Sequence, residues 1–248
     1  MPNHGKRYRQ ARATIDRERL YTPAEAVRLL KRLQAAKFDE TVEVHFKTGL
    51  NVRHADQQLR GTLMLPHGTG KDVRVAVFAE GEKAKEAQDA GADVVGSGDL
   101  ATQIEGGFDD FDVAIATPDQ MGTVGKLGRI LGPRGKMPNP KTGTVTFDVG
   151  RAVTDAKAGK LEYRTDRGAN VHLTLGKKSF DERHLLENYA AVVDELVRAK
   201  PAAAKGRYIR SITLTSSMDP GIKVDPSKTR DIVAELEELE EEPQAVTA

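Results

Sequence analysis

The chain has 248 residues, 38% hydrophobic and 30% charged, which is the composition of a folded protein with a sizeable core. It contains no cysteine, which excludes disulfides and thiolate zinc sites and favours a reducing, intracellular compartment. No apolar run approaches the roughly 20 residues that cross a bilayer. The N-terminal MPNHGKRYRQARATIDRER lacks the apolar core of a secretory signal, although part of an organelle transit peptide stays open. We therefore expect a cytoplasmic protein with no membrane partner.

The net charge of +1 hides an uneven distribution of charge along the chain. Residues 1–67 carry 13 Lys/Arg against 7 Asp/Glu, and residues 160–228 carry 13 against 9. Residues 68–159 carry 11 against 14, and the last twenty carry 1 against 7. The two basic blocks favour a polyanionic partner, while surface cations that only keep the protein soluble are the alternative.

The first block begins with a helix signal and continues with a strand. Thr22-Pro23-Ala24-Glu25 has the form of a capping box with Pro at the first helical position, and an apolar stripe follows at Ala26, Leu29, Leu30 and Leu33. The run TVEVHFKTG at 41–49 alternates as a strand does.

The middle block alternates strands with helices. Strand-like runs lie at 73–79, 92–96 and 111–117, and short helical segments follow the first two. Thr117-Pro118-Asp119-Gln120 predicts a third helix that begins with another capping box. Alternation with short connections is typical of a parallel α/β unit, so we expect a Rossmann-like domain over 68–159.

The third block resembles the first. Strand-like runs lie at 161–165, 171–176 and 208–217. Ser179-Phe180-Asp181-Glu182 predicts a capping box before a long apolar-striped helix that ends ahead of Pro201. We therefore expect helices against a mostly antiparallel sheet.

These patterns predict an α/β protein of two domains, one inserted in the other. Residues 1–67 with 160–228 would form a discontinuous α/β sandwich around the 68–159 insertion, while a tandem of three small units is the alternative. Gly-rich turns at 65–71 and 157–160 mark the two linkers, with expected hinge residues Pro66, Gly68, Gly70 and Gly159. The acidic tail 229–248 is expected to be a solvated appendage, with a marginal helix as the other possibility.

Enzyme and cofactor motifs are absent from the sequence. Gly70-Lys71 lacks the earlier glycine and the following Ser or Thr of a phosphate loop, and no GxGxxG follows a strand. The six histidines have no HxxxH or HExxH spacing. We expect neither an enzyme, nor a cofactor, nor a metal site.

The stretch GKLGRILGPRGKMPNPKTG at 125–143 segregates positive charge in the acidic block. Gly122, Gly125 and Gly128 recur on one expected helix face, and each costs roughly 1 kcal/mol relative to Ala. Something must approach that face closely, either the sheet beneath it or a ligand. The cations form an expected phosphate-binding patch of Lys126, Arg129, Arg134, Lys136 and Lys141.

Five segments make the chain resemble a known family. FDETVEVHF (38–46), RGTLMLPHGTGK (60–71), LGRILGPRGKMPNPKTGTVT (127–146), GKKSFDE (176–182) and KGRYIRSITLTSSMDPGIKVD (205–225) closely resemble the bacterial large-subunit ribosomal protein one, or L-one, family. The resemblance runs in order over roughly residues 1–228.

The resemblance implies a fold and a function. Members of the family have two domains, the second Rossmann-like and inserted in the first. They bind a helical stalk of large-subunit ribosomal RNA near the exit site and help to move deacylated tRNA outward. Many bacterial members also repress their own messenger RNA, and none is known as an enzyme. We expect a protein that is monomeric when free; a member acting mainly off the ribosome, as messenger-RNA regulator or RNA chaperone, is the alternative.

The resemblance also implies which residues contact ribosomal RNA. Hydroxyls such as those of Thr41 and Ser217 can exchange hydrogen bonds with 2′-OH groups, and Phe38 offers apolar contact unless it is a core aromatic. Glu40 and Glu43 would accept from 2′-OH groups or orient a neighbouring cation, and His172 is either a contact or structural. The full set carried over is Lys37, Phe38, Glu40, Thr41, Glu43, His172, Ser211, Thr213, Ser217, Met218 and Asp219. The second-domain patch is expected to face tRNA.

Asp219 is a departure from the family pattern Thr-Met-Gly-Pro-Gly, which reads Ser217-Met218-Asp219-Pro220-Gly221 here. We expect Asp219 to bring a charge and a side chain to a place where the backbone approaches RNA, with strain if φ is positive. We therefore expect the chain with Asp219 to bind RNA more weakly than its Asp219→Gly variant.

Overall fold

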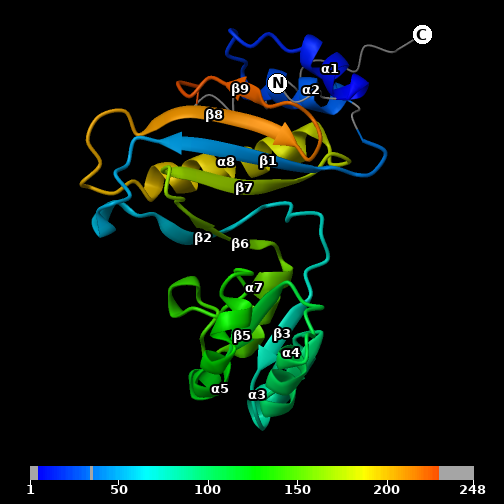
Figure 1. The fold of residues 1–248 in the computed structure, drawn as a ribbon, viewed down its shortest axis with the longest axis vertical. Helices are drawn as coiled ribbons and strands as arrows, with labels where there is room; N and C mark the ends of the chain where they lie inside the picture. Colours follow the sequence, from blue (N-terminus) through cyan, green and yellow to red (C-terminus); the bar gives the residue numbers. More distant parts are fainter. Residues whose placement is uncertain (1–4, 34–35, 229–248) are drawn as a thin grey trace. The chain divides into compact units, whose positions relative to one another are not determined.

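The computed structural model describes residues 5–33 and 36–228, and its elements are shown in Figure 1. The chain divides into two compact units, one of Met1–Gly70 with Tyr163–Ala248 and one of Lys71–Glu162. The inner unit thus begins and ends three residues later than the 68–159 expected from sequence. The expected acidic tail, 229–248, lies outside the described residues.

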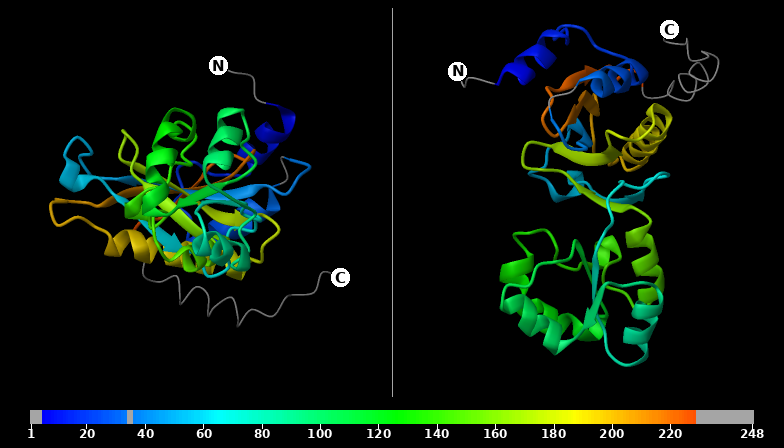
Figure 2. Two further views of the ribbon diagram at one scale, coloured as in Figure 1. Left: turned by 90° about the horizontal axis from the view of Figure 1, so that it is seen from below. Right: turned by 90° about the vertical axis from the view of Figure 1, so that its right-hand side faces the viewer.

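The fold is mixed α/β, as expected, and the first unit is built on an antiparallel sheet. Its four strands have the order β7-β1-β8-β9. The elements of this unit are α1 (Lys6–Ala13), α2 (Pro23–Arg32), β1 (Thr41–Thr48), a 3-10 turn (Ala55–Gln57), β2 (Arg60–Met64), β7 (Asn170–Lys177), α8 (Glu182–Arg198), β8 (Ile209–Ser216) and β9 (Ile222–Val224). Helices α2 and α8 contact each other and the sheet, and Figures 1 and 2 place α8 behind it.

Local sequence explains the two long elements of this unit. The Thr22 hydroxyl accepts from the Glu25 N–H at the start of α2 while the Glu25 carboxylate accepts from the Thr22 N–H, so the first predicted capping box is confirmed. The second is wrong: the N-cap of α8 is Asp181, without a side-chain cap. The Ser179 hydroxyl donates instead to Asp39, which ties the start of α8 to the segment before β1.

The second unit is built on a parallel sheet of order β4-β3-β5. Its elements are β3 (Val75–Phe78), α3 (Glu82–Asp89), β4 (Val94–Gly96), α4 (Gly98–Glu105), β5 (Val113–Ala116), 3-10 turns (Pro118–Gln120 and Pro140–Thr142), α5 (Met121–Lys126), α6 (Gly128–Leu131) and α7 (Val149–Lys157). Separate apolar clusters lie against its two faces, one with residues of α4, α5 and α6 and the other with residues of α3 and α7. The capping box predicted at Thr117 is wrong, since Thr117 makes no side-chain cap.

The chain passes between the units at Gly70 and again within β6 (Lys160–Arg164), which pairs with β2. The first passage is fastened to the first unit by the buried Asn188. Its Oδ1 accepts from the His67 N–H at 3.1 Å, and its Nδ2 donates to the Gly68 carbonyl at 3.1 Å. Gly70 has φ +67° and lies so close to Phe180 that a Cβ would be 2.7 Å from the ring. The hinge at Pro66, Gly68, Gly70 and Gly159 stays a prediction. The hydrogen bonds of Asn188 fix the first linker to the first unit as far as Gly68.

No helix within 5–33 and 36–228 is both long enough and apolar enough to traverse a lipid bilayer.

Candidate nucleic-acid interface

One face of the antiparallel sheet carries a polar surface. β1 alternates between buried and half-exposed residues, so Val42, Val44, Phe46 and Thr48 face inward, and Thr41, Glu43, His45 and Lys47 face outward. Strand pairing arranges the outward residues in three rows, which we call the open face: Thr174-Glu43-Thr215, His172-His45-Thr213-Lys223 and Asn170-Lys47-Ser211.

Two histidines lie at the centre of the open face. The Nδ1 atoms of His45 and His172 are 2.9 Å apart, so one ring donates to the other. Burial, and then the neighbouring His172, lower the pKa of His45, while Glu43 raises it. His172 Nε2 is also 3.5 Å from the Asp166 carboxylate. The open face therefore combines hydroxyls, imidazoles and a carboxylate, which are groups able to hydrogen-bond the sugars and base edges of RNA.

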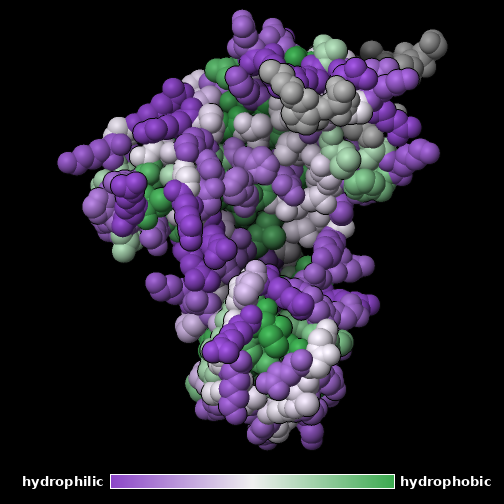
Figure 3. Space-filling view, viewed as in Figure 1, coloured by the Kyte–Doolittle hydropathy of each residue, from purple (hydrophilic) through white to green (hydrophobic). Residues whose placement is uncertain are grey.

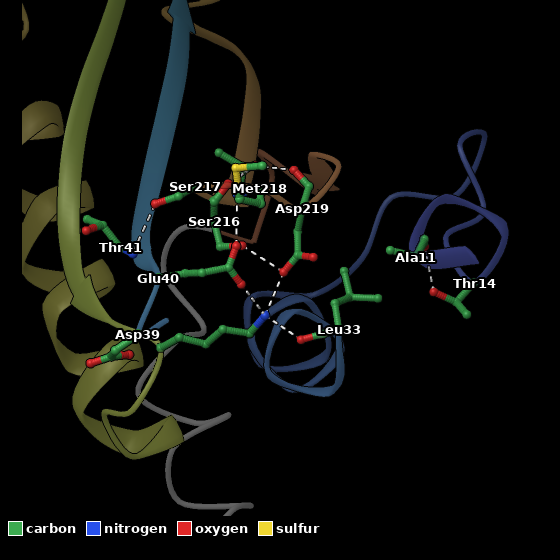
Figure 4. Close-up of polar contacts among 12 residues, drawn as sticks. Ala11, Thr14, Leu33, Asp39, Glu40, Thr41, Ser216, Ser217, Met218 and Asp219 are labelled. Atoms are coloured by element: carbon green, nitrogen blue, oxygen red, sulfur yellow. Dashed lines mark hydrogen bonds and ion pairs between the residues drawn. The ribbon is translucent and has the colours of Figure 1, made fainter. Parts of the chain in front are cut away.

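At one end of this sheet two segments meet to form the tip, which we define as residues 37–41 and 216–219. The Ser217 hydroxyl accepts from the Thr41 N–H at 3.2 Å, and Glu40 Oε1 accepts from the Met218 N–H at 2.9 Å (Figure 4). Phe38 is 59% exposed and Met218 is 54% exposed. Phe38 is therefore no core aromatic, and the tip presents two apolar side chains to solvent.

A buried cluster of charges lies beneath the tip. Lys178 Nζ donates to Glu40 Oε2 at 2.9 Å, to Asp219 Oδ2 at 2.6 Å and to the Leu33 carbonyl, which uses all three of its protons. Figure 4 shows the carboxylates of Glu40 and Asp219 turned toward this one nitrogen. Glu40 is 2% exposed and Asp219 is 6% exposed. Of the two roles expected for Glu40, contact with a 2′-OH is wrong and orientation of a cation is what its geometry provides.

The structure places Asp219 differently from what was expected, while its effect on RNA affinity stays a prediction. Its φ is not positive, since Ala169 is the one non-glycine residue with positive φ among those described. Its side chain points inward, where Oδ2 also accepts from the Ser216 hydroxyl at 2.7 Å. Its Oδ1 is buried without a hydrogen-bond partner. Asp219 brings no charge to the tip surface, because Lys178 holds that charge inside.

The basic stretch of the second unit is smaller than predicted. Lys126, Arg129 and Lys141 are exposed. Arg134 is also exposed but pairs with Asp109 at 2.9 Å. Lys136 does not belong to the patch: its Nζ donates to the Asp109 carboxylate and carbonyl and to the Phe111 carbonyl, and it lies over the Phe111 ring. Lys136 thus fixes the 132–137 turn onto the loop before β5.

The glycines beside this patch face open space. A Cβ built on Gly122, Gly125 or Gly128 would meet no described atom within 4 Å. The expected single helix is two short ones, α5 and α6, with Leu127 between them. Of the two explanations expected for these glycines, close approach of the sheet is excluded, and approach of a ligand stays a prediction.

Several residues of the open face were missed from the sequence: His45, Lys47, Asn170, Thr174, Thr215 and Lys223. The signal was present, because the alternation of TVEVHFKT places Glu43, His45 and Lys47 on one side of the strand. What was lacking was the strand pairing, which places β7 and β8 beside β1 and β9 beside β8.

No group of three or more His, Asp or Glu side chains that could hold a metal ion occurs in the described part of the chain.

Comparison with known proteins identifies the chain's family. Residues 29–220 match the model of the ribosomal protein L1p/L10e family, which is more than half of the chain. The chain belongs to this family. Proteins of the family are structural components of the ribosome, so the expectation that the chain is not an enzyme is confirmed.

Curated relatives agree with the family over nearly the whole length. The chain is 63% identical to the large ribosomal subunit protein uL1 of Thermobifida fusca over 226 residues, covering 91% of the chain and 96% of that protein. It is 64% identical to the protein of the same name from Rubrobacter xylanophilus over 228 residues, covering 92% and 99%. For the Salinispora tropica protein of that name the identity is 58% over 229 residues, covering 92% and 96%. The chain is thus a structural protein of the large ribosomal subunit, at the ribosome in the cytoplasm as expected.

Proposed function

We propose that the first unit binds a stalk of large-subunit ribosomal RNA near the exit site, using the open face and the tip. The same surface binds a similar structure in the chain's own messenger RNA and so represses its translation. The second unit, through Lys126, Arg129 and Lys141, contacts tRNA at the exit site and assists its release.

The observation that carries this proposal is the convergence of the family-implied residues. Lys37, Phe38, Thr41, Ser217 and Met218 come from segments about 180 residues apart in sequence, and they meet at the tip. Glu43, His172, Ser211 and Thr213 belong to three neighbouring strands and share the open face. Hydroxyl and imidazole groups beside two exposed apolar side chains fit RNA, in which 2′-OH groups and unstacked bases are read together.

The role of the second unit is supported by its exposed cations and by helix α5, whose glycines leave the backbone uncovered. Lys126 and Arg129 follow glycines that leave the helix backbone uncovered, and Lys141 lies further along the chain in the Pro140–Thr142 turn. None of the three cations has a carboxylate partner among the described residues. A phosphate backbone can approach such a surface closely.

The deciding experiment measures binding of the purified protein to a stalk fragment and to a scrambled duplex of equal length, at two salt concentrations. We expect a preference for the stalk that survives the higher salt, since shape recognition adds to charge. Equal binding to both RNAs, weakening together as salt rises, would contradict the proposal.

Two matched pairs of variants locate the surface. Met218→Ala and Phe38→Ala remove exposed apolar side chains from the tip, and each should weaken stalk binding about tenfold, as expected for loss of a stacking contact. Met64→Ala, in β2, and Phe147→Ala, in the second unit, remove side chains of comparable exposure, 49% and 57%, that do not belong to the tip. These controls should bind as the unaltered protein does.

Co-sedimentation with large ribosomal subunits separates the ribosomal role from an off-ribosome one. A member acting mainly on messenger RNA or as an RNA chaperone would be absent from the subunit peak.

A further inference from the structure

Helix α1 carries an unneutralised set of cations. Lys6, Arg7, Arg9 and Arg12 are all exposed, and the helix has no acidic residue in its first turn. None of the four side chains has a carboxylate partner within the described chain, whereas cations elsewhere in this unit, such as Arg19 and Lys178, do. The helix therefore projects about four uncompensated positive charges.

This arrangement weakens the helix itself. Lys6 and Arg7 lie in the first turn, at the positive end of the helix dipole, where cations are unfavourable. The N-cap is Gly5 and makes no side-chain cap. The helix has 8 residues and buries Ala11 alone, and isolated helices this short are marginal in water. A sequence that breaks local rules in this way is expected where a ligand supplies the compensation.

The helix is nonetheless held in place by the segment that follows it. Ile15 is buried, and the Asp16 N–H donates to the Tyr21 hydroxyl at 2.9 Å. The Lys223 ammonium donates to the Arg17 carbonyl at 3.0 Å, and the Tyr21 N–H donates to the Lys223 carbonyl at 3.0 Å. The chain after α1 is thus fastened to β9, the edge strand of the antiparallel sheet.

The side of the sheet on which α1 lies decides what its charges can reach. Figures 1 and 2 show α1 beside β9 and on the opposite side of the sheet from α8. Because α8 packs on the buried face, α1 lies on the side of the open face. Lys223 ends the central row of the open face, and its ammonium group also donates a hydrogen bond to Arg17, in the segment that follows α1 in sequence.

We infer that α1 is a phosphate-binding wall along the β9 edge of the open face, contacting the sugar-phosphate backbone of the RNA held there. This inference rests on the proposed function and extends its surface to four residues outside the set implied by the family: Lys6, Arg7, Arg9 and Arg12. The open face and tip read the RNA, whereas α1 contributes sequence-independent affinity and fixes the orientation of the backbone.

The first test replaces the four α1 cations by Gln, a good helix former, as K6Q/R7Q/R9Q/R12Q in the full chain. Its charge-matched control is R53Q/K85Q/R151Q/K205Q, which removes four exposed, dispersed cations. For the α1 variant we expect stalk affinity to fall at least about tenfold at 0.15 M salt, and the slope of log Kd against log salt to fall by about three, as loss of four phosphate contacts requires. The control should change that slope by less than about one.

The second test does not use the quadruple α1 variant, so it does not depend on how well that variant folds. Because the protein has no cysteine, Gln10→Cys creates a unique exposed attachment point on α1 for an iron chelate that cleaves nearby RNA with hydroxyl radicals. Asp194→Cys, on the exposed side of α8, is the matched control. We expect cuts in the stalk backbone from position 10 and none from position 194.

The outcomes separate the two proposals. An unaltered protein without preference for the stalk overturns the proposed function. An unaltered protein that prefers the stalk, together with an unchanged salt slope in the α1 variant or no cuts from position 10, overturns the assignment of α1 alone.

Discussion

The two sheets of this protein differ in how many of their faces are covered. In the first unit, β1 alternates and has one apolar face, and α2 and α8 contact the neighbouring strands β7, β8 and β9 of the same sheet. In the second unit all four residues of β3 are buried, and apolar clusters lie on both faces of its sheet. An antiparallel sheet can leave one face to solvent, whereas parallel strands need crossover helices that cover both faces.

This difference explains where each unit can bind. The open face offers a flat array of polar side chains at strand spacing, positioned by the sheet itself. The covered sheet has no such surface, so a ligand of the second unit would meet the helices and loops around the sheet, such as α5 and the 132–143 segment. In the proposed function, the first unit therefore recognises the shape of its RNA, and the second contacts its ligand through charge and uncovered helix backbone.

The largest expected contrast is between one residue of each sheet. Phe78→Ala empties a fully buried position of β3 and should lower the free energy of unfolding by about 3–5 kcal/mol. Thr213→Ala, on the open face, should change it by less than about 0.5 kcal/mol but weaken stalk binding. Urea unfolding with hydrogen exchange resolved by unit is the measurement, because the units need not unfold together. Equal losses of stability would remove the distinction between the sheets.

The next effect concerns the charges beneath the tip. Lys178→Met leaves Glu40 and Asp219 buried without a cation, which should cost roughly 3 kcal/mol of unfolding free energy. Adding Asp219→Gly to that variant removes one of the two orphaned carboxylates and should recover part of the loss. Lys205→Met, which alters an exposed lysine without a side-chain partner among the described residues, is the control. If the double variant were less stable than Lys178→Met alone, the coupling between Lys178 and Asp219 would be wrong.

The sequence predicted the sheets better than the helix starts. Strand runs such as 41–49 and 111–117 were found within a few residues because alternation or continuous burial is a local signal. Two of three predicted capping boxes were wrong. The Ser179 hydroxyl donates to Asp39, which is distant in sequence, and Thr117 precedes a 3-10 turn without capping it through its side chain. Helices α1 and α7 were not predicted.

The candidate site was predicted in part. The family resemblance supplied residues of the tip and the open face, but composition cannot tell an outward carboxylate from an inward one. Glu40 and Asp219 were misplaced because their burial depends on Lys178, which lies 138 and 41 positions away in sequence. Lys136 was misplaced for the same reason, since Asp109 and the Phe111 carbonyl hold it.

A smaller effect follows from the histidines of the open face. Because burial and His172 lower the pKa of His45, its contribution to stability is present above about pH 6.5 and is lost as pH falls through the lowered pKa. RNA phosphates favour the protonated ring, so stalk affinity should instead rise, by about threefold between pH 7.5 and 5.5. His45→Gln should flatten this rise, whereas His54→Gln, in an exposed loop, should not. An affinity that falls with stability on acidification would mean that no phosphate approaches His45.

The smallest effect tests the bare helix of the second unit. Gly125→Ala adds a methyl group where no described atom lies within 4 Å, so it should stabilise α5 by up to about 1 kcal/mol, measured by thermal unfolding. Gly132→Ala is the contrasting variant, because its Cβ would lie 2.5 Å from the Gly128 carbonyl oxygen and should destabilise the same region. If Gly125→Ala stabilises the protein and also weakens tRNA binding, the glycine is retained for a ligand at the expense of the fold. Unchanged tRNA binding would leave the cations Lys126, Arg129 and Lys141 as the whole contact, and the uncovered backbone would have no part in it.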